Sequence, residues 1–407
     1  MLGTLLDRLT GYFSKYFLIG SFFPVFFAAV INGVLAHAQF PSFRTFVAHY
    51  LELPAGRQAF YGFAGLVLVA VAAYLLSTIK HYLREILEGE HWPDRSLIRY
   101  FLTDPFLESE NTRLQRCDQE LETARRGRRK VRQAALLEAL ASARGKGKEK
   151  GGAPTYDPTK NQAIVQLEAE RYRGASIEAS NLTEAVTALA AALESGDADD
   201  NDPLDRDQQR LMAIIQYATT KWNDEYIAAF GRRGALFGET AVRPTRFGNI
   251  AETILSYAAT RYMMNLEAFW TRLQPILQKN QSFFADLQET KSQLDFMVTM
   301  FWLTAVTVLL WLAVIAVTGH GILLFLLIAV GGPLFAWLWY SLGFTNYLAF
   351  AQMVRSGIDL NRFDLLRALH VPLPAGLEQE RRLWDALSQL AQYGELPPLT
   401  YQHGQGS

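Results

Sequence analysis

The chain has 407 residues, of which 50% are hydrophobic and 19% are charged, and its formal net charge at pH 7 is -1. This charge balance argues against a general attraction to nucleic acid, which is therefore an unlikely partner. The single cysteine, Cys117, excludes an intramolecular disulfide.

Residues 1–16 alternate leucines and aromatics with charged side chains, a pattern typical of an amphipathic helix in the headgroup layer. Residues 17–87 are predicted to form a first transmembrane hairpin, because they contain the apolar runs Phe17–Ala38 and Ala59–Ile79. A helix needs about 20 apolar residues to cross the hydrocarbon core. The second helix is expected to continue beyond the membrane and to end at Gly89.

Residues 88–291 are predicted to form a helical cytoplasmic domain, inserted between the two membrane-spanning parts of the chain. Its apolar periodicity predicts helices over 107–143, 161–194, 203–230 and 250–270, with a break at Pro275. Two stretches without such periodicity, 144–160 and 196–202, are predicted to be flexible linkers. A third, 231–249, is predicted to be a connection interrupted by several glycines. Residues 278–295 are expected to run into the third span as one helix.

Residues 292–351 are predicted to form a second transmembrane hairpin, with spans at Phe296–Val317 and Ile322–Tyr347. Residues 352–407 are predicted to be a C-terminal cytoplasmic helical unit with helices at 359–369 and 377–393. No alternating strand pattern of any length is present. The predicted fold is therefore all-α, an integral membrane protein with four transmembrane helices in two hairpins, and the lipid bilayer is its first partner.

The distribution of lysine and arginine predicts the topology, because cytoplasmic flanks of membrane spans are rich in these residues. Basic residues flank the outer ends of both hairpins, at Arg8, Lys15, Lys80, Arg84, Lys279, Lys291, Arg355, Arg362 and Arg367. The short connections within the hairpins carry few of them. Both termini and the central domain are therefore predicted to face the cytoplasm.

The segment Arg243-Pro244-Thr245-Arg246-Phe247-Gly248-Asn249, together with Tyr257, Arg261-Tyr262 and Phe269–Leu273, resembles a pattern of uncharacterised bacterial multi-spanning membrane proteins. The stretches Tyr16–Leu35 and Phe363–Trp384 are similar in the same sense. The resemblance covers about a third of the chain and implies a multi-pass protein of the bacterial inner membrane. It implies no activity and no catalytic residue.

Motifs of enzyme chemistry are absent from the sequence. It contains no phosphate loop, no His-Glu-x-x-His, no Gly-x-Ser-x-Gly and no Cys-x-x-Cys. We therefore expect no catalytic residue, no cofactor and no metal site, and an enzyme acting on lipid or nucleotide is the weakest alternative.

Arg243, Arg246 and Asn249 form the first candidate site, a contact for an anionic ligand. They lie at a predicted helix start, where backbone N–H groups and arginines favour nucleotide, phospholipid or carboxylate anions. The alternative is that these arginines pair with acids such as Glu252 or Glu267 and fix the packing of the domain.

A dense basic run is the second candidate, a contact for anionic lipid headgroups. It comprises Arg125, Arg126, Arg128, Arg129, Lys130 and Arg132. Basic residues near an anionic surface contribute about 1 kcal/mol each. The alternatives are a solvated charge run and, less supported because aromatic residues are not interleaved, a contact for nucleic acid.

Polar residues and helix breakers within the spans are the third candidate, a pore lining or hinge. They are Pro24, Asn32, Gly331, Gly332, Pro333 and Asn346. No Asp, Glu, Lys or Arg lies deep in the spans, which disfavours a proton pump or an ion-coupled transporter. The alternative is that neighbouring helices simply pack against the kinks.

Two functions fit these patterns. The first is an oligomeric membrane channel or effector gated through its cytoplasmic helical domain by an unknown ligand or protein partner; four spans are too few to enclose a wide pore in one copy, so a homo-oligomer is expected. Host defence is one role for such an effector, although no residue specifies it. The second is a non-conducting scaffold or receptor that recruits cytoplasmic partners.

Overall fold

The computed structural model describes residues 14–90, 92, 103–145, 166–167, 170–171, 181–182, 184–187, 203–239, 241–319 and 321–394. These residues are helical, with turns between the helices and no strand among them, which confirms the all-α prediction. Residues 1–13, most of the predicted linker 144–160 and all of the linker 196–202 lie outside the described ranges.

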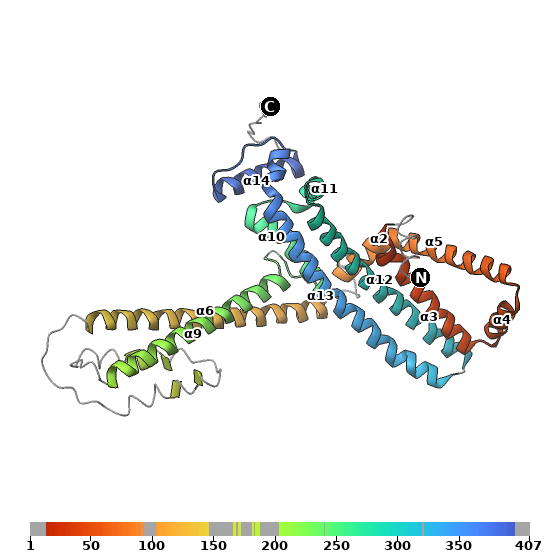
Figure 1. Cartoon of the computed structure of the whole chain (residues 1–407), viewed down its shortest axis with the longest axis horizontal. Helices are drawn as coiled ribbons and strands as arrows, with labels where there is room; N and C mark the ends of the chain where they lie inside the picture. The colour runs from red at the N-terminus through yellow and green to blue at the C-terminus, as the bar shows by residue number, and fades with distance from the viewer. Residues whose placement is uncertain are drawn as a thin grey trace. The chain divides into compact units, whose positions relative to one another are not determined.

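Figure 1 labels the helices that the structure describes; the π-helical turn η1 carries no label there. Their bounds are α2 Lys15–Phe17, η1 Leu18–Phe22, α3 Phe23–Gln39, α4 Pro41–Glu52, α5 Ala55–Glu88, α6 Asp104–Gly145, α9 Pro203–Leu236, α10 Arg246–Tyr262, α11 Leu266–Leu277, α12 Gln281–Thr318, α13 Ile322–Ala368 and α14 Leu377–Tyr393. The chain divides into two compact units, which we call the span unit (residues 1–110 and 236–407) and the arm unit (residues 111–235).

Four helical segments of the span unit are long and apolar enough to cross a membrane. They are Lys15–Gln39, which includes α3, and the helices α5, α12 and α13. The last three have 34, 38 and 47 residues, more than the roughly 20 that a bilayer requires. Each therefore extends well beyond one membrane thickness, as predicted for residues 80–88 and for 278–295, although α12 begins at Gln281.

Near the start of the first span lies the π-helical turn η1, which ends two residues before Pro24. Proline has no backbone N–H, so Pro24 cannot donate to the carbonyl oxygen of Gly20, four residues earlier. That oxygen instead accepts a long hydrogen bond, 3.4 Å, from the Thr299 hydroxyl of α12. The irregular turn is thus satisfied by a neighbouring helix, as membrane-embedded backbone requires.

Helices α10, α11 and α14 pack against the ends of α12 and α13 that extend beyond the predicted spans; we call this assembly the helical head. Its core includes the fully buried side chains of Phe247, Leu273, Leu366 and Trp384. Two tyrosines of α10 join it to α13, since the hydroxyls of Tyr257 and Tyr262 both donate to the Asp359 carboxylate, each at 2.7 Å. Burial and these hydrogen bonds raise the pKa of both tyrosines above its usual range.

Three predicted boundaries differ from the structure. The helix predicted over 250–270 is two helices, because Met263 adopts a left-handed conformation with φ of 62° and Asn265 then caps α11. Residues 231–236 belong to α9 rather than to a connection. Pro275 lies inside α11, which ends at Leu277.

The predicted C-terminal helices are both present, and 359–369 proves to be continuous with the fourth span. It forms the end of α13, which runs from Ile322 to Ala368 without a break. The second helix, α14, has the predicted bounds Leu377–Tyr393. The head is therefore built directly on the extension of a helix that is long and apolar enough to cross a membrane.

The start of α10 lies unusually close to the end of α5. A Cβ atom added to Gly248 would lie 2.0 Å from the Glu88 carbonyl oxygen, and one added to Gly89 would lie 2.7 Å from the Pro244 ring. Gly89 also has a φ of 77°, which ends α5 as predicted. The glycines thus allow α5 and α10 to meet backbone to backbone.

We predict that Gly248→Ala destabilises the span unit, because the added methyl group has no space against the Glu88 carbonyl. Overpacking costs about 1–3 kcal/mol, and the backbone contact here places the effect at the upper end. Thermal unfolding of the purified protein in detergent measures it. The control is Gly33→Ala in α3, where a Cβ meets nothing within 4 Å. Equal unfolding temperatures for the two variants would contradict the packing argument.

Candidate functional site

The first candidate site is a cavity of 590 Å³ where α5, α12 and α13 meet α10 and α11. We call it the junction cavity; its polar and aromatic lining includes His81, Arg84, Glu88, Glu267, Trp270, Gln274, Phe284, Gln288, Lys291, Tyr347 and Phe350. Its volume falls within the range of pockets that hold ligands of drug or cofactor size, about 300–1,000 Å³. It lies at the level where the predicted spans give way to the head.

One wall of the junction cavity is a buried polar cluster that links α5 to α13. The Tyr347 hydroxyl donates to the Glu88 carboxylate at 2.6 Å, and the Arg84 guanidinium lies 3.1 Å from the same carboxylate. The His81 imidazole Nε2 lies 2.7 Å from the Glu85 carboxylate on the same helix. Glu88 is thus held by a cation and a phenol, as a buried carboxylate requires.

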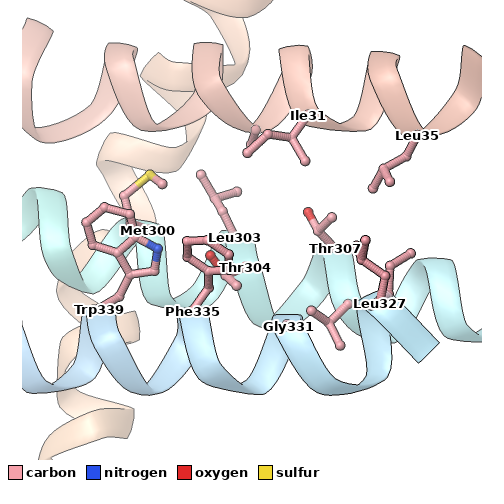
Figure 2. A pocket seen from close by; sticks show the side chains of 14 residues that line it. Ile31, Leu35, Met300, Leu303, Thr304, Thr307, Leu327, Gly331, Phe335 and Trp339 are labelled. Atoms are coloured by element: carbon pink, nitrogen blue, oxygen red, sulfur yellow. The ribbon is translucent and has the colours of Figure 1, made fainter. Parts of the chain in front are cut away.

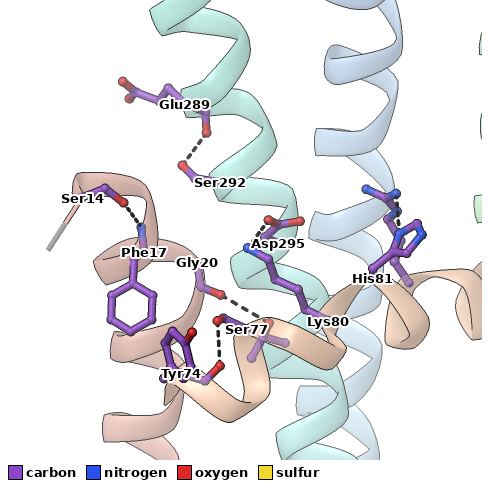
Figure 3. Close-up of polar contacts among 12 residues, drawn as sticks. Ser14, Phe17, Gly20, Tyr74, Ser77, Lys80, His81, Glu289, Ser292 and Asp295 are labelled. Carbon is purple, nitrogen blue, oxygen red and sulfur yellow. Dashed lines mark hydrogen bonds and ion pairs between the residues drawn. The ribbon is translucent and has the colours of Figure 1, made fainter. Parts of the chain in front are cut away.

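A second set of contacts links α5 to α12. Lys80 forms an ion pair with Asp295 at 2.7 Å, and the Trp302 indole N–H donates to the Leu83 carbonyl oxygen at 3.0 Å. Figure 3 shows the Lys80–Asp295 pair beside the η1 turn that carries Gly20. Asp295 is nearly buried, whereas Lys80 retains about 29% of its side-chain exposure. These contacts hold α5 at a fixed register on α12.

Four polar side chains in the junction cavity have no hydrogen bond to any described residue: Trp270, Gln274, Gln288 and Lys291. Because they are accessible from the cavity, water or a ligand can satisfy them. They supply mostly N–H donors, and one of them is a cation. No group of three or more His, Cys, Asp or Glu with metal-binding geometry occurs within the described ranges.

The first candidate set, Arg243, Arg246 and Asn249, is engaged within the span unit. Arg243 forms an ion pair with Glu252 at 3.0 Å, and the Arg246 guanidinium lies 5.7 Å from the centre of the Phe344 ring. Buried Asn249 accepts from the Arg243 backbone N–H at 2.8 Å and donates to Glu110 at 3.0 Å. These are the contacts of the packing alternative, and anion binding by the set stays a prediction.

The basic run lies on α6 in the arm unit, which has its own core of α6 and α9 residues. That core includes Val131, Leu211 and Ile214. Gly127 lies against the Trp222 ring, and the Arg128 guanidinium lies 4.6 Å from the centre of the Tyr226 ring. Arg125, Arg126, Arg129, Lys130 and Arg132 are exposed. Arg128 is therefore packed against α9, while lipid binding by the exposed residues stays a prediction.

A second cavity, the span groove, lies among α3, α12 and α13 and has a volume of 360 Å³. Figure 2 shows its apolar side chains, such as Ile31 and Phe335, with the hydroxyls of Thr304 and Thr307 on α12. Beside it, the Asn32 amide donates to Thr307 at 3.2 Å and accepts from the Trp311 indole at 2.8 Å. Asn32 therefore joins α3 to α12 within the spans.

The remaining pore or hinge candidates lie at distinct places. Gly331 and Gly332 line the span groove, Pro333 follows them inside α13, and Asn346 is half-buried further along the same helix. Pro24 follows the η1 turn. The structure thus brings Asn32, Gly331 and Gly332 to the region of the groove and leaves Pro24 and Asn346 away from its lining.

We predict that Gly332→Ala disturbs the packing of α12 on α13, whereas Gly331→Ala does not. A Cβ at Gly332 would lie 2.2 Å from a Val308 methyl group, but a Cβ at Gly331 meets nothing within 4 Å. The expected loss is about 1–3 kcal/mol, measured by thermal unfolding in detergent. The double variant Gly332→Ala/Val308→Ala should recover most of it. No recovery would show that α12 and α13 do not meet at this point.

Sequence reasoning missed the residues of the junction cavity. Trp270 entered only as part of the resembling stretch Phe269–Leu273, and Lys291 entered only through the topology prediction. Gln274 and Gln288 belong to no motif. The available signal was a polar face on 278–295, where Gln288 and Lys291 lie one helical turn apart on a helix that continues into an apolar span. Comparison of the chain with known protein families, with curated proteins and with solved structures finds no match.

Proposed function

We propose that the chain forms an oligomeric membrane channel or membrane effector of the bacterial inner membrane, gated through its helical head. In this proposal the spans form two hairpins, residues 88–291 are inserted between them, and both termini face the cytoplasm. The layout rests on the apolar runs and on the lysine and arginine bias. The channel or effector function rests on the way in which the head is joined to the spans.

The observation that carries the proposal is the continuity of α12 and α13 from their apolar segments into the head. A packed helix moves as a rigid element, so a displacement in the head would be passed to the residues of the spans. The contacts Lys80–Asp295 and Glu88–Tyr347 tie α5 to both helices at the same level. A change in the junction cavity would therefore reach three of the four spans.

The chemistry of the spans supports conduction rather than coupled transport. Their predicted hydrocarbon segments carry hydroxyls and amides, such as Thr304, Thr307 and Asn32, but no acidic residue, lysine or arginine. Ion-coupled transporters place ionisable groups there, whereas a channel can be lined by neutral polar groups and closed by apolar ones. Because four spans cannot enclose a wide pore, the path would lie between copies of the chain.

The second candidate function is a membrane-anchored scaffold or receptor. It is favoured by the arm unit, which is a separate compact unit with its own buried core and an exposed basic helix face. Such a unit can bind a partner without any change in the spans. Pulldown from membranes with the full chain and with a chain that lacks residues 111–235 would separate the two functions. Loss of every captured partner on deletion, with ion flux absent throughout, would favour the scaffold.

The gating proposal is tested by reconstitution of the purified full chain into liposomes. We expect efflux of an entrapped ion when the low-molecular-weight fraction of a bacterial cytosolic extract is added. Tyr347→Phe, which removes the hydroxyl bound to Glu88 and keeps the ring, should shift the response by about tenfold, because a hydrogen bond to a charged group contributes about 1.5–3 kcal/mol.

The matched control is Tyr74→Phe, since Tyr74 is exposed on α5 and its hydroxyl has no hydrogen bond among the described residues. This variant should respond as the unmodified chain does. A chain that passes no ion with any fraction, at any protein-to-lipid ratio that gives oligomers, would overturn the channel.

A further inference from the structure

The junction cavity combines unengaged N–H donors with apolar and aromatic walls. The donors are Lys291, Trp270, Gln274 and Gln288, none of which has a hydrogen bond to another described residue. The apolar walls come from Phe284, Leu287 and Phe350, among others. A site of this kind fits an organic molecule with a charged end and a flat or apolar body.

The charges around the cavity favour an anion. Its buried acid, Glu88, is already bound by Arg84 and Tyr347. The neighbouring acid Asp295 is paired with Lys80. Lys291 has no acidic partner within ion-pair distance among the described residues, so its ammonium is available to a ligand. Arg84 adds a second cation to the same wall, although it shares its charge with Glu88.

Glu267 is the one feature of the lining that could attract a cation instead. It is exposed, and it lies in the first turn of α11, where a carboxylate is stabilised by the helix dipole and by water. The Glu267 carboxylate is therefore stable without a bound cation. Lys291 is exposed as well, but Arg84 lines the same cavity, so the lining presents two cations to a ligand.

The size of the cavity excludes a simple inorganic ion as the best occupant. A space of 590 Å³ holds a molecule of nucleotide size, and a single phosphate would leave the aromatic walls uncovered. The Trp270 ring is half-buried in the lining and its indole N–H has no partner among the described residues, so it can both stack on a ring and donate a hydrogen bond.

From these contacts we infer that the junction cavity binds an organic phosphate, with the phosphate at Lys291 and Arg84 and the apolar or ring portion against Trp270 and Phe284. The phosphate is either that of a soluble nucleotide or that of an anionic phospholipid whose headgroup enters from the adjacent membrane surface. The inference rests on the proposed function in one respect: the ligand would be the one that gates the spans.

The test is binding to the purified full chain, without any measurement of flux. Nucleoside mono-, di- and triphosphates and inorganic phosphate are titrated against the chain in nanodiscs of phosphatidylcholine, and tryptophan fluorescence and calorimetry report binding. In the second arm, phosphatidylglycerol replaces part of the phosphatidylcholine. Saturable binding of a nucleotide identifies the soluble source, and retention of phosphatidylglycerol after detergent extraction identifies the lipid.

Lys291→Gln should weaken binding about tenfold or more, because a hydrogen-bonded charge is lost. Trp270→Leu should weaken it and remove most of the fluorescence change. Lys279→Gln is the matched control, since Lys279 is an exposed lysine just before α12 and outside the cavity lining. Glu267→Gln should leave binding unchanged or make it tighter.

Unchanged binding in Lys291→Gln, or loss of binding in Glu267→Gln, would overturn the inference. The inference would also be overturned if neither the nucleotides and inorganic phosphate nor phosphatidylglycerol bind saturably. Because Lys291 and Trp270 have no hydrogen bond to a described residue, both variants should fold, and thermal unfolding checks this. Ligand binding without ion flux would support the ligand site and contradict the channel. Ion flux without ligand binding would support the channel and contradict the ligand site.

Discussion

The end of helix α5 is the constraint on which the span unit depends. At Glu88 and Gly89 this helix meets α10 backbone to backbone, because Gly248 leaves no side chain between its own Cα and the Glu88 carbonyl. The Glu88 carboxylate, one side chain away, accepts the Tyr347 hydroxyl of α13. Glu88 and Gly248 therefore set the positions of α5, α10 and α13 relative to one another. The junction cavity lies beside this meeting point, where α5, α10 and α13, together with α11 and α12, leave a space between them.

The free-energy cost of burying Glu88 and Asp295 explains why each of these carboxylates has polar partners. A buried carboxylate without partners would cost several kcal/mol, so Glu88 requires both Arg84 and Tyr347, and Asp295 requires Lys80. Pairs of this kind add little net stability compared with apolar packing. What they supply is register, since an ion pair or phenol contact is lost when one helix slides by a single residue. The apolar residues hold the helices together, and the buried polar residues determine which positions face one another.

The four apolar segments and the end of α5 could be predicted from the sequence because their signals are local. A span is recognised from its own run of about 20 apolar residues, and the end at Gly89 from a residue that tolerates positive φ. The break between α10 and α11 has no such signal. Met263 adopts a left-handed conformation, and Ser388 of α14 binds both sides of that turn, accepting from the Asn265 N–H and donating to the Met263 carbonyl oxygen. Similarly, Arg84 and Lys291 are distant in sequence, so only the packed helices show that they share a cavity.

A ligand in the junction cavity can affect the spans only if it binds two arrangements of the helices unequally. The cavity meets this condition because its walls belong to separate helices: Trp270 lies on α11 and Lys291 on α12. A molecule that contacts both would favour one spacing of α11 and α12 over another. Helix α12 then continues for 16 residues to Thr307, about 24 Å at the rise of an α-helix. There the Thr307 hydroxyl accepts from Asn32, so a rotation or shift of α12 would strain or break an interhelical hydrogen bond in the spans. The coupling free energy between two sites in a protein is usually about 1–3 kcal/mol. One interhelical hydrogen bond and the packing around it can supply a coupling of this size between the cavity and the spans.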